Sequence, residues 1–397
     1  MVPTLFEKAI PLLNKIEQAG YEAYFVGGSV RDYLMGRQIN DVDIATSAFP
    51  SEVKKIFPHT VDVGIEHGTV LVLENGEEYE ITTFRTESEY NDYRRPEAVE
   101  FIRSLVEDLK RRDFTMNSIA MDISGEIHDP FNGYEDIQSR VIRSVGSAKE
   151  RFSEDALRMM RAVRFVSQLG FALEVETSKA LAEHHSLLRH IAIERVTQEF
   201  EKLLSGQNKQ KALELLLSSK LYNHLPGLSS KQDSLIRMTN LPIHSLTSAE
   251  SWLLLLYLLQ EEQPKHFLIK WRLSTKTIKR LCKDLTFLQE RLGNDWSNYL
   301  VYCAGLPTAH RVENVYSVLE GKKSVEVDYI TTIYESLPIK NRSELDLTGN
   351  DLLQWTNKKP GRWIKQILDT AEKSVINGEI QNEKNAIRGW LHRCKLI

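Results

Sequence analysis

The sequence predicts an α+β fold, with a mixed α/β region at the N-terminal end and an all-helical remainder. Up to about residue 146, short apolar runs alternate with helical patterns, and turn signals such as Asn75-Gly76 separate the runs. From Ser147 onward, strand patterns become rare and apolar residues recur at helical spacing. A chain of 397 residues is long enough for several packed units. We therefore expect one β-containing domain followed by helical domains.

The N-terminal region alternates helical and strand patterns, with Gly20 ending the first helix. The predicted elements are helices over 4–19, 51–57 and 105–111, a short helix starting near Ser29, strands over 24–26, 41–44, 68–73 and 78–84, and a hairpin of 119–123 with 126–128.

Composition limits the classes of protein that the chain resembles. The net charge of −4 provides no overall basic field, so any nucleic-acid binding must use local patches. Cys282, Cys303 and Cys394 are far apart in sequence, which is typical of thiols in a reducing compartment. The N-terminus lacks a secretory pattern, and the longest apolar run, residues 252–259, is too short to cross a bilayer. We expect a cytoplasmic protein without a membrane partner.

Asp41 and Asp43 are the candidate metal ligands. They are two residues apart in a predicted strand, so their side chains share a face. Two carboxylates without a basic neighbour in the strand repel each other, and Mg²⁺, which prefers oxygen ligands, relieves that repulsion. The preceding Gly27 and Gly28 let the backbone approach a ligand, and the N–H groups of the next helix favour phosphate. This stretch predicts a metal-dependent phosphoryl or nucleotidyl transfer site.

Glu80 and Arg112 each allow two interpretations. Glu80 is either an exposed strand residue or a third carboxylate that faces the metal ions. Arg112 forms either a surface salt bridge or a contact to a triphosphate, because guanidinium groups match phosphate oxygens.

A second candidate cluster lies in a helix predicted over residues 153–168, with Ser153 as its N-cap. Asp155 and Arg158 are three residues apart and so are neighbours on the helix surface, and the helix also presents Arg161 and Arg164. An exposed pair of this kind is either a weak salt bridge or part of a ligand site. The excess of arginines over aspartates favours an anionic ligand.

An aspartate beside an arginine also has the chemistry to recognise a nucleotide base. A carboxylate only accepts hydrogen bonds and a guanidinium only donates them. Cytosine and adenine each present an amino donor next to a ring acceptor, whereas guanine and uracil present the reverse pattern. Asp155 with Arg158 would therefore accept C and A and reject G and U, because the wrong base leaves buried polar groups unpaired.

Three further segments have open interpretations. Residues 87–97 (ESEYNDYRRPE) form either a simple surface loop or a lid over the site. Residues 265–283 contain seven basic residues and no acidic one, which indicates either a solvated helical face or a stripe that contacts nucleic-acid phosphates. Basic residues also occur near the C-terminal end, where they could contact the same nucleic acid: Lys358, Lys359, Arg362, Lys365 and Arg388.

Five motifs carry a family resemblance that runs in order from residue 24 to about 165. GGSVRD, DVDIAT, RRDFTMNSIA, DPFNG and EDALRMMRAVRF resemble the head and neck motifs of the class II tRNA nucleotidyltransferases, which include bacterial CCA-adding enzymes and poly(A) polymerases. DLTGNDLL and residues 360–363 resemble the C-terminal domain of CCA-adding enzymes from Gram-positive bacteria.

The resemblance implies a polymerase-β-like head with a mixed sheet over 1–146, a helical neck for base recognition over 147–205, a helical body over 206–320 and a tRNA-binding tail over 321–397. It implies an enzyme that adds C, C and A to the tRNA 3′ end from CTP and ATP, with Mg²⁺ as cofactor. The loop motif at 92–96 favours addition of the complete CCA. The implied roles are metal binding and catalysis for Asp41 and Asp43, and nucleotide binding for Gly28, Arg31, Arg112, Asp155, Arg158, Arg161 and Arg164.

Two other functions remain open at this point. A poly(A) polymerase on the same scaffold would use ATP alone, and adenine also satisfies the predicted pair of Asp155 and Arg158. A non-catalytic tRNA-binding protein is a second alternative, although all the expected catalytic positions are present. The sequence is compatible with a homodimer.

Overall fold

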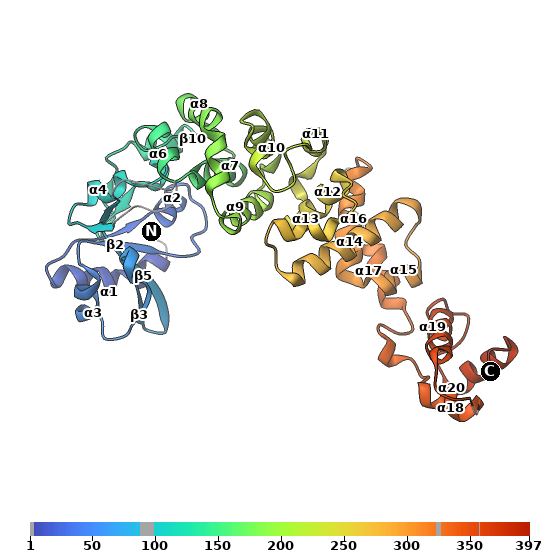
Figure 1. Cartoon of the computed structure of the whole chain (residues 1–397). Helices are drawn as coiled ribbons and strands as arrows, with labels where there is room; N and C mark the ends of the chain where they lie inside the picture. The colour runs from blue at the N-terminus through green and yellow to red at the C-terminus, as the bar shows by residue number, and fades with distance from the viewer. Residues whose placement is uncertain (1–3, 88–98, 323–326, 357) are drawn as a thin grey trace. The chain divides into compact units, whose positions relative to one another are not determined.

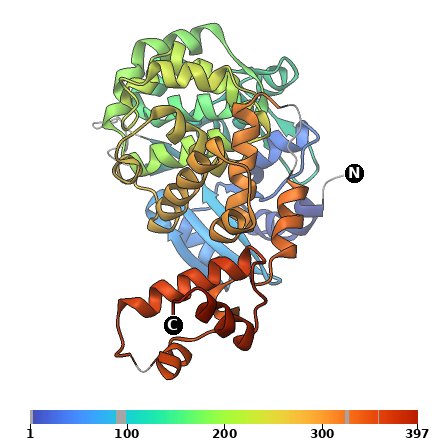
Figure 2. The ribbon, with the colours of Figure 1, turned by 90° about the vertical axis from the view of Figure 1, so that its right-hand side faces the viewer.

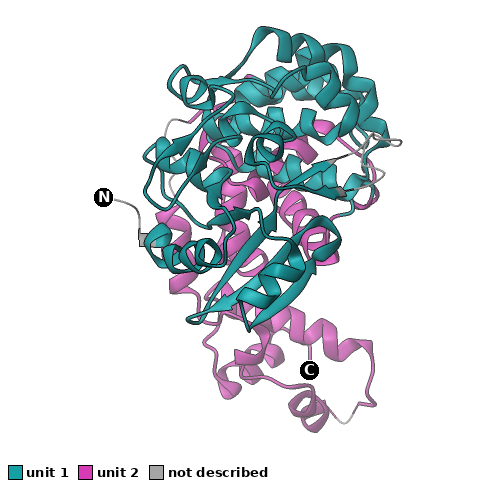
Figure 3. Cartoon of the chain, turned by 90° about the vertical axis from the view of Figure 1, so that its left-hand side faces the viewer, with its two compact units in different colours: residues 1–239, 270–272 teal, residues 240–269, 273–397 magenta. Residues whose placement is uncertain are grey.

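The computed structural model describes residues 4–87, 99–322, 327–356 and 358–397. The chain divides into two compact units (Figure 3). Unit 1 comprises residues 1–239 and 270–272, and unit 2 comprises residues 240–269 and 273–397. The four-part division predicted above is finer than these two units and stays a prediction. The predicted loop of residues 87–97 falls almost entirely outside the described residues.

The N-terminal part of unit 1 is built on a mixed β-sheet (Figure 1). Among the described residues the sheet has seven strands in the order β3-β4-β5-β2-β1-β8-β9, in which β2 and β5 are parallel and the other neighbours are antiparallel. The predicted hairpin is present at Asn75-Gly76, where both residues have positive φ. The α+β prediction is therefore confirmed.

These strands span β1 Ala23–Val26, β2 Asp43–Thr46, β3 Thr60–Gly64, β4 Thr69–Glu74, β5 Glu77–Thr83, β8 Ala120–Met121 and β9 Ile127–His128. Two small sheets pair β6 Arg85–Glu87 with β7 Val99–Phe101, and β10 Val141–Ile142 with β11 Ala172–Leu173. The helices among them are α1 Thr4–Gln18, α2 Gly28–Leu34, α3 Pro50–Ile56, α4 Leu105–Lys110 and α5 Gly133–Gln138.

The two faces of the sheet have different roles. Phe25 and Ile44 lie in register on β1 and β2 and are buried, and Phe6 of α1 packs on Phe25 with ring centroids 4.6 Å apart. Successive side chains of a strand point to opposite faces. Asp43 and its register partner Glu80 on β5 therefore lie on the face away from α1. The first face packs on α1. The opposite face carries a second buried apolar cluster, which includes Val26 and Ala45, together with the carboxylates of the candidate site.

The rest of unit 1 is helical. Its helices are α6 Ala148–Glu154, α7 Leu157–Leu169, α8 Val175–His184, α9 Ile193–Ser205, α10 Lys209–Ser218 and α11 Gln232–Thr239. α7 packs against α9 and α10 through a side that includes Met160 and Val163, which are fully buried. This buried side of the helix agrees with the apolar spacing of the sequence.

The single helix predicted over 153–168 is wrong, because the chain breaks between α6 and α7. Asp155 has an extended backbone, with φ −133° and ψ 101°. Ser153 lies inside α6, where its hydroxyl donates to the Lys149 carbonyl at 2.9 Å, so it is not the predicted N-cap. The residues on both sides of the break favour helix, and for this reason the sequence pattern does not reveal it.

The regular elements in the described part of unit 2 are all helices. Its helices are α12 Ser248–Leu259, α13 Pro264–Lys270, α14 Thr275–Gly293, α15 Asn298–Ala304, α16 Leu306–Leu319, α17 Asp328–Ser336, α18 Gly349–Thr356, α19 Arg362–Ile376 and α20 Lys384–Arg393. The last residue of α13, Lys270, is counted in unit 1. The last three helices gather around the C-terminus (Figure 2, red). No helix in the described part of the chain combines the length and the apolar character that crossing a membrane requires.

Candidate active site

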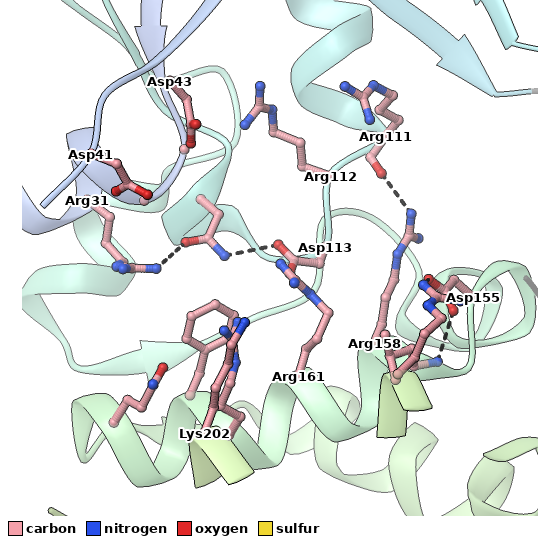
Figure 4. A pocket seen from close by; sticks show the side chains of 18 of the residues that line it. Arg31, Asp41, Asp43, Arg111, Arg112, Asp113, Asp155, Arg158, Arg161 and Lys202 are labelled. Carbon is pink, nitrogen blue, oxygen red and sulfur yellow. Dashed lines mark hydrogen bonds and ion pairs between the residues drawn. The ribbon is translucent and has the colours of Figure 1, made fainter. Parts of the chain in front are cut away.

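Asp41 and Asp43 point into one cavity (Figure 4). The predicted strand over 41–44 is wrong in its start, because β2 begins at Asp43 and Asp41 lies in the loop before it. β2 cannot begin earlier because the neighbouring strand β1 ends opposite Asp43. Val26 pairs with Asp43, and the chain then turns away at Gly27, so residues before Asp43 have no partner on β1. The two carboxylates nevertheless come together, as the sequence predicts.

The surroundings of Asp43 favour a bound cation. Loss of water contact inside the cavity raises the pKa of Asp43, the carboxylates of Asp41 and Glu80 raise it further, and the Arg112 guanidinium opposes them. This excess of negative charge fits a divalent metal ion with oxygen ligands. No group of three or more His, Cys, Asp or Glu side chains is arranged to hold a metal ion within the described ranges. The candidate ligands are therefore the two aspartates.

Gly27 leaves room for the two charged groups beside it. Its φ of +73° suits glycine, and a Cβ atom there would lie 3.2 Å from Arg112 Nη1 and 3.5 Å from Asp43 Oδ2. The Ser29 hydroxyl donates to the Val26 carbonyl at 3.0 Å and fixes the turn. Gly28 also lines the cavity. The glycine pair thus places backbone, an arginine and an aspartate in close proximity.

Asp108 holds the arginines above the cavity. It is almost completely buried, and its two oxygens accept hydrogen bonds from Arg111 Nη2 at 2.8 Å and Arg112 Nη2 at 3.1 Å. Burial by itself would raise the pKa of Asp108, but the two guanidinium groups lower it overall. Arg112 is therefore paired with a buried carboxylate and not in a surface salt bridge, and it also lines the cavity; its contact to a triphosphate stays a prediction.

A hydrogen-bonded chain of side chains crosses the cavity (Figure 4). Arg31 Nη1 donates to Asn117 Oδ1 at 2.7 Å, and Asn117 Nδ2 donates to Asp113 Oδ1 at 3.0 Å. Asp113 Oδ2 accepts from Arg161 Nε at 2.7 Å. Burial would raise the pKa of Asp113, but Arg161 and Asn117 lower it to about 2. This chain connects the turn of α2 with α7.

The sequence did not predict roles for Asp113 and Asn117. Both belong to the RRDFTMN motif and both line the cavity. The sequence nevertheless contains a signal for them. An acid and an amide lie four residues apart in a motif that is rich in arginine.

Asp155 and Arg158 both line the cavity, but they do not form the predicted pair on one helix. Asp155 lies in the break between α6 and α7, where its Oδ1 accepts from the Leu157 N–H at 3.0 Å and its Oδ2 pairs with Arg195 at 2.8 Å. Arg158 Nη1 donates to Glu154 Oε2 at 2.7 Å, and its Nη2 donates to the Arg111 carbonyl at 2.9 Å. Each group is oriented by a partner that the sequence did not indicate.

Phe165 organises the remaining arginines. Its ring is buried, and the guanidinium carbons of Arg31, Arg161 and Arg164 lie 5.3, 5.7 and 4.1 Å from its centroid. Arg164 also pairs with Glu199 of α9 at 2.9 Å, and burial lowers the pKa of Arg164 to about 10. Phe165 lies four residues after Arg161, on the same side of α7.

These groups enclose one large cavity of about 1040 Å³ within unit 1. Among the described residues, its lining contains nine arginine or lysine side chains and five carboxylates. The excess of positive charge suits a polyphosphate, while the carboxylates concentrate at Asp41, Asp43 and Glu80. All the predicted site residues line this cavity: Gly28, Arg31, Asp41, Asp43, Arg112, Asp155, Arg158, Arg161 and Arg164.

Comparison with known proteins agrees with this geometry. Residues 23–143 match the family described as poly A polymerase head domain, residues 170–232 match the probable RNA and SrmB-binding site of polymerase A, and residues 243–391 match tRNA nucleotidyltransferase domain 2. The CCA-adding enzyme of Bacillus cereus (strain 03BB102) is 51% identical over 395 residues, covering 99% of this chain and all of that protein. The chain belongs to the CCA-adding enzymes. The enzyme of Bacillus anthracis is 50% identical over 394 residues, covering 99% of each chain.

Solved structures place the fold in the same group. The crystal structure of the Bacillus stearothermophilus CCA-adding enzyme in complex with CTP matches with a TM-score of 0.93 and 45% identity, and the match covers 100% of this chain and 98% of that one. A tRNA nucleotidyltransferase complexed with a primer tRNA and an incoming ATP analogue matches with a TM-score of 0.60 and 26% identity, covering 81% and 96% of the chains. The predicted family and enzyme class of this CCA-adding enzyme are therefore confirmed.

Proposed function

We propose that this CCA-adding enzyme adds C, C and A to the 3′ end of tRNA from CTP and ATP and releases pyrophosphate. One observation carries the assignment of the site: the aspartate pair and the arginine-rich wall line the same cavity. This occurs in a chain that is half identical, over its full length, to proteins named CCA-adding enzyme. The reaction places the enzyme with tRNA, and we infer a cytoplasmic location from the same substrate.

Asp41 and Asp43 would hold Mg²⁺. They supply hard carboxylate oxygens. Burial raises the pKa of Asp43, and the nearby carboxylates of Asp41 and Glu80 raise it further; a cation would relieve that negative charge. When bound, Mg²⁺ supplies charge neutralisation at the phosphates and a lower pKa for the attacking hydroxyl. Glu80 of β5 is the register partner of Asp43, so its carboxylate adds to the negative charge next to the two aspartates. We assign the metal-binding role to the two aspartates.

Arg112, Gly28 and Arg31 would bind the triphosphate. Arg112 lies next to Gly27 and Asp43, so a phosphate held at the aspartates would be within reach of its guanidinium. Gly28 allows the backbone to approach the phosphate oxygens. Arg31 is oriented by Asn117 and Asp32, at 2.7 and 2.9 Å, before any ligand binds. Such preorganised charges stabilise developing negative charge without a cost of rearrangement.

Asp155 and Arg158 would recognise the base. Each Asp155 oxygen has two lone pairs, so the bonds to Leu157 and Arg195 leave acceptor capacity for the amino group of cytosine or adenine. Arg158 donates to the Arg151 carbonyl, Glu154 and the Arg111 carbonyl, and its guanidinium would turn an N–H toward the ring acceptor of the base when the nucleotide binds. Guanine and uracil would place a carbonyl against the carboxylate. Arg161 and Arg164 complete the wall of the pocket.

In the reaction, the 3′-oxygen of tRNA forms a bond to the α-phosphorus of the nucleotide while the bond to the pyrophosphate oxygen breaks. The hydroxyl proton leaves to solvent, and the pyrophosphate carries away the electron pair of the broken bond. Arg112 stabilises the negative charge that moves onto the leaving group. Asp155 and Arg158 hold the base during this step, so a correct base positions the α-phosphorus.

The test uses three reactions with a tRNA that ends just before CCA. We expect two added nucleotides with CTP alone, none with ATP alone and three with both, as resolved by product length on a denaturing gel. A poly(A) polymerase would instead extend the primer repeatedly with ATP alone. A non-catalytic tRNA-binding protein would add nothing under any of the three conditions.

We also propose the division into a head (1–146), neck (147–205), body (206–320) and tail (321–397), with tRNA contacts on the body and tail. Lys276 and Lys279 of α14 are exposed in unit 2 and support a phosphate-binding stripe there.

A further inference from the structure

The cationic side chains that line the cavity of unit 1 differ in their partners. Each of seven arginines has a carboxylate oxygen of the protein within 3.1 Å: Arg31, Arg111, Arg112, Arg158, Arg161, Arg164 and Arg195. Arg85 donates to the His67 carbonyl. Lys202 is the remaining cation, and within the described ranges no carboxylate lies at ion-pair distance from its ammonium group.

Lys202 is nevertheless placed toward the cavity by its helix. It lies three residues after Glu199 and seven after Arg195 on α9, and this spacing puts the three residues on one face. Gln168 of α7 also lines the cavity and follows Arg161 by seven residues, so it belongs to the cavity side of its own helix. The Gln168 amide and the Lys202 ammonium thus line the cavity near the C-terminal ends of α7 and α9.

This corner adjoins Arg164 of the pocket wall but is separate from the residues assigned to base recognition and to the triphosphate. Gln168 follows Arg158 by ten residues on α7, which corresponds to about 15 Å along the helix axis. In Figure 4, Lys202 lies on the opposite side of the cavity from Asp43 and Arg112. Base recognition and triphosphate binding therefore leave this corner of the cavity without an occupant.

The geometry of the reaction indicates what the occupant is. In nucleotidyl transfer the attacking and leaving oxygens lie roughly in line on opposite sides of the phosphorus. With the leaving pyrophosphate toward Arg112, the tRNA 3′ end must enter from the side that carries Lys202. An ammonium there, without a carboxylate partner in the described part of the chain, would face the phosphodiester groups of the terminal nucleotides.

We propose that Lys202, assisted by Gln168, forms a subsite for a phosphodiester of the tRNA 3′ strand and positions the primer end for attack. This inference rests on the proposed function, because it assumes the assigned directions of base and triphosphate. Lys202 is a positioning residue in this scheme and takes no part in bond making. The subsite recognises a phosphate and not a base, so it would serve all three additions.

The experiment compares Lys202→Met, Lys202→Arg and Lys211→Met in the full chain. Lys211 of α10 is an exposed lysine outside the cavity and is the matched control. For Lys202→Met we expect the KM for tRNA to rise about threefold to tenfold, with the KM for CTP unchanged. The slope of log affinity against log salt for tRNA should fall by about 0.7. Lys202→Arg should restore both values, and Lys211→Met should match the wild type.

Each other outcome overturns the subsite. A rise in the KM for CTP would assign Lys202 to the triphosphate. Equal losses in Lys202→Met and Lys211→Met would show a general charge effect, and an unchanged Lys202→Met would show a solvated surface lysine. Unaltered CTP binding confirms that each variant is folded. A wild-type protein that adds no C and A to tRNA would refute the proposed function itself, independently of the Lys202 variants.

Discussion

Replacing Asp113 with Asn tests the idea that internal ion pairs orient the arginines of the site. The Asp113 carboxylate accepts hydrogen bonds from three groups: Oδ1 accepts from the Phe114 backbone and the Asn117 amide, and Oδ2 accepts from Arg161 Nε. Arg161 Nη2 also forms an ion pair with Oδ2. An asparagine has one acceptor oxygen and one NH₂ group. In either orientation of the amide, its NH₂ group would face a donor. We therefore expect both a loss of stability and a displaced Arg161.

The expected loss of stability follows from the pKa of Asp113, which the folded protein lowers from 3.8 to about 2. A difference of this size corresponds to about 2 kcal/mol of the free energy of unfolding at pH 7. Because the folded pKa is the lower one, this contribution is complete above pH 4 and disappears as the pH falls through 2. At pH 3 roughly half of it should remain.

The assay combines urea denaturation at pH 7 and pH 3 with steady-state kinetics. At pH 7 the variant should lose about 2 kcal/mol, and the difference from the wild type should shrink at pH 3. The kcat/KM for CTP should fall about tenfold or more, because Arg161 loses its charged partner. Asp136→Asn is the control. Asp136 is a buried carboxylate that accepts from Thr115 and Arg143 but does not line the cavity.

The control should lose stability and keep its kcat/KM for CTP at low denaturant and low temperature. Equal kinetic losses in both variants would show that the effect of Asp113→Asn is only a weakened fold. A stable and fully active Asp113→Asn variant would refute the orienting role of this carboxylate.

Three further predictions test other parts of the site. Asp41→Ala should abolish nucleotide incorporation while CTP binding, measured at equilibrium, partly persists; turnover in this variant would contradict the metal assignment. Gly27→Ala should lower the free energy of unfolding by about 1–2 kcal/mol, because φ is +73° at this position. It should also raise the KM for CTP, because the new Cβ atom would lie 3.2 Å from Arg112 Nη1 and displace that side chain. An unchanged KM would count against a phosphate role for Arg112. The double change Lys276→Glu and Lys279→Glu should weaken tRNA binding and flatten its salt dependence, and an equal affinity at low salt would argue against the stripe on α14.

The sequence predicts the head of the molecule well because its signals are local. Asn75-Gly76 demands a tight hairpin, and alternation places Phe25 and Ile44 on the packed face. The wrong predictions concern features that distant residues determine. β2 starts at Asp43 because β1 ends, and Asp155 leaves the helix where Arg195, forty residues later, pairs with it. No local pattern contains either constraint.

The candidate residues could be predicted as a set, but not their partners. The motifs indicate which side chains line the cavity, whereas the pairing of Arg158 with Glu154, or of Arg164 with Glu199, depends on how α6, α7 and α9 pack. Phe165 illustrates the limit. Its helical position predicts burial, yet the clustering of guanidinium groups around its ring requires α2 and α7 to come together.

The chain from Arg31 through Asn117 and Asp113 to Arg161 explains how one cavity can accept two different nucleotides. The four side chains connect the turn of α2 to α7, and each bond between them is 3.0 Å or shorter. Their charges are held in place by protein partners and not by the ligand, so the phosphate-binding groups keep one geometry whichever base is bound. Guanine and uracil can then be rejected at Asp155 and Arg158 without rebuilding the site of bond formation. A change at Asp113 should therefore reduce incorporation of CTP and ATP to the same extent, whereas a change at Asp155 should weaken the exclusion of GTP and UTP.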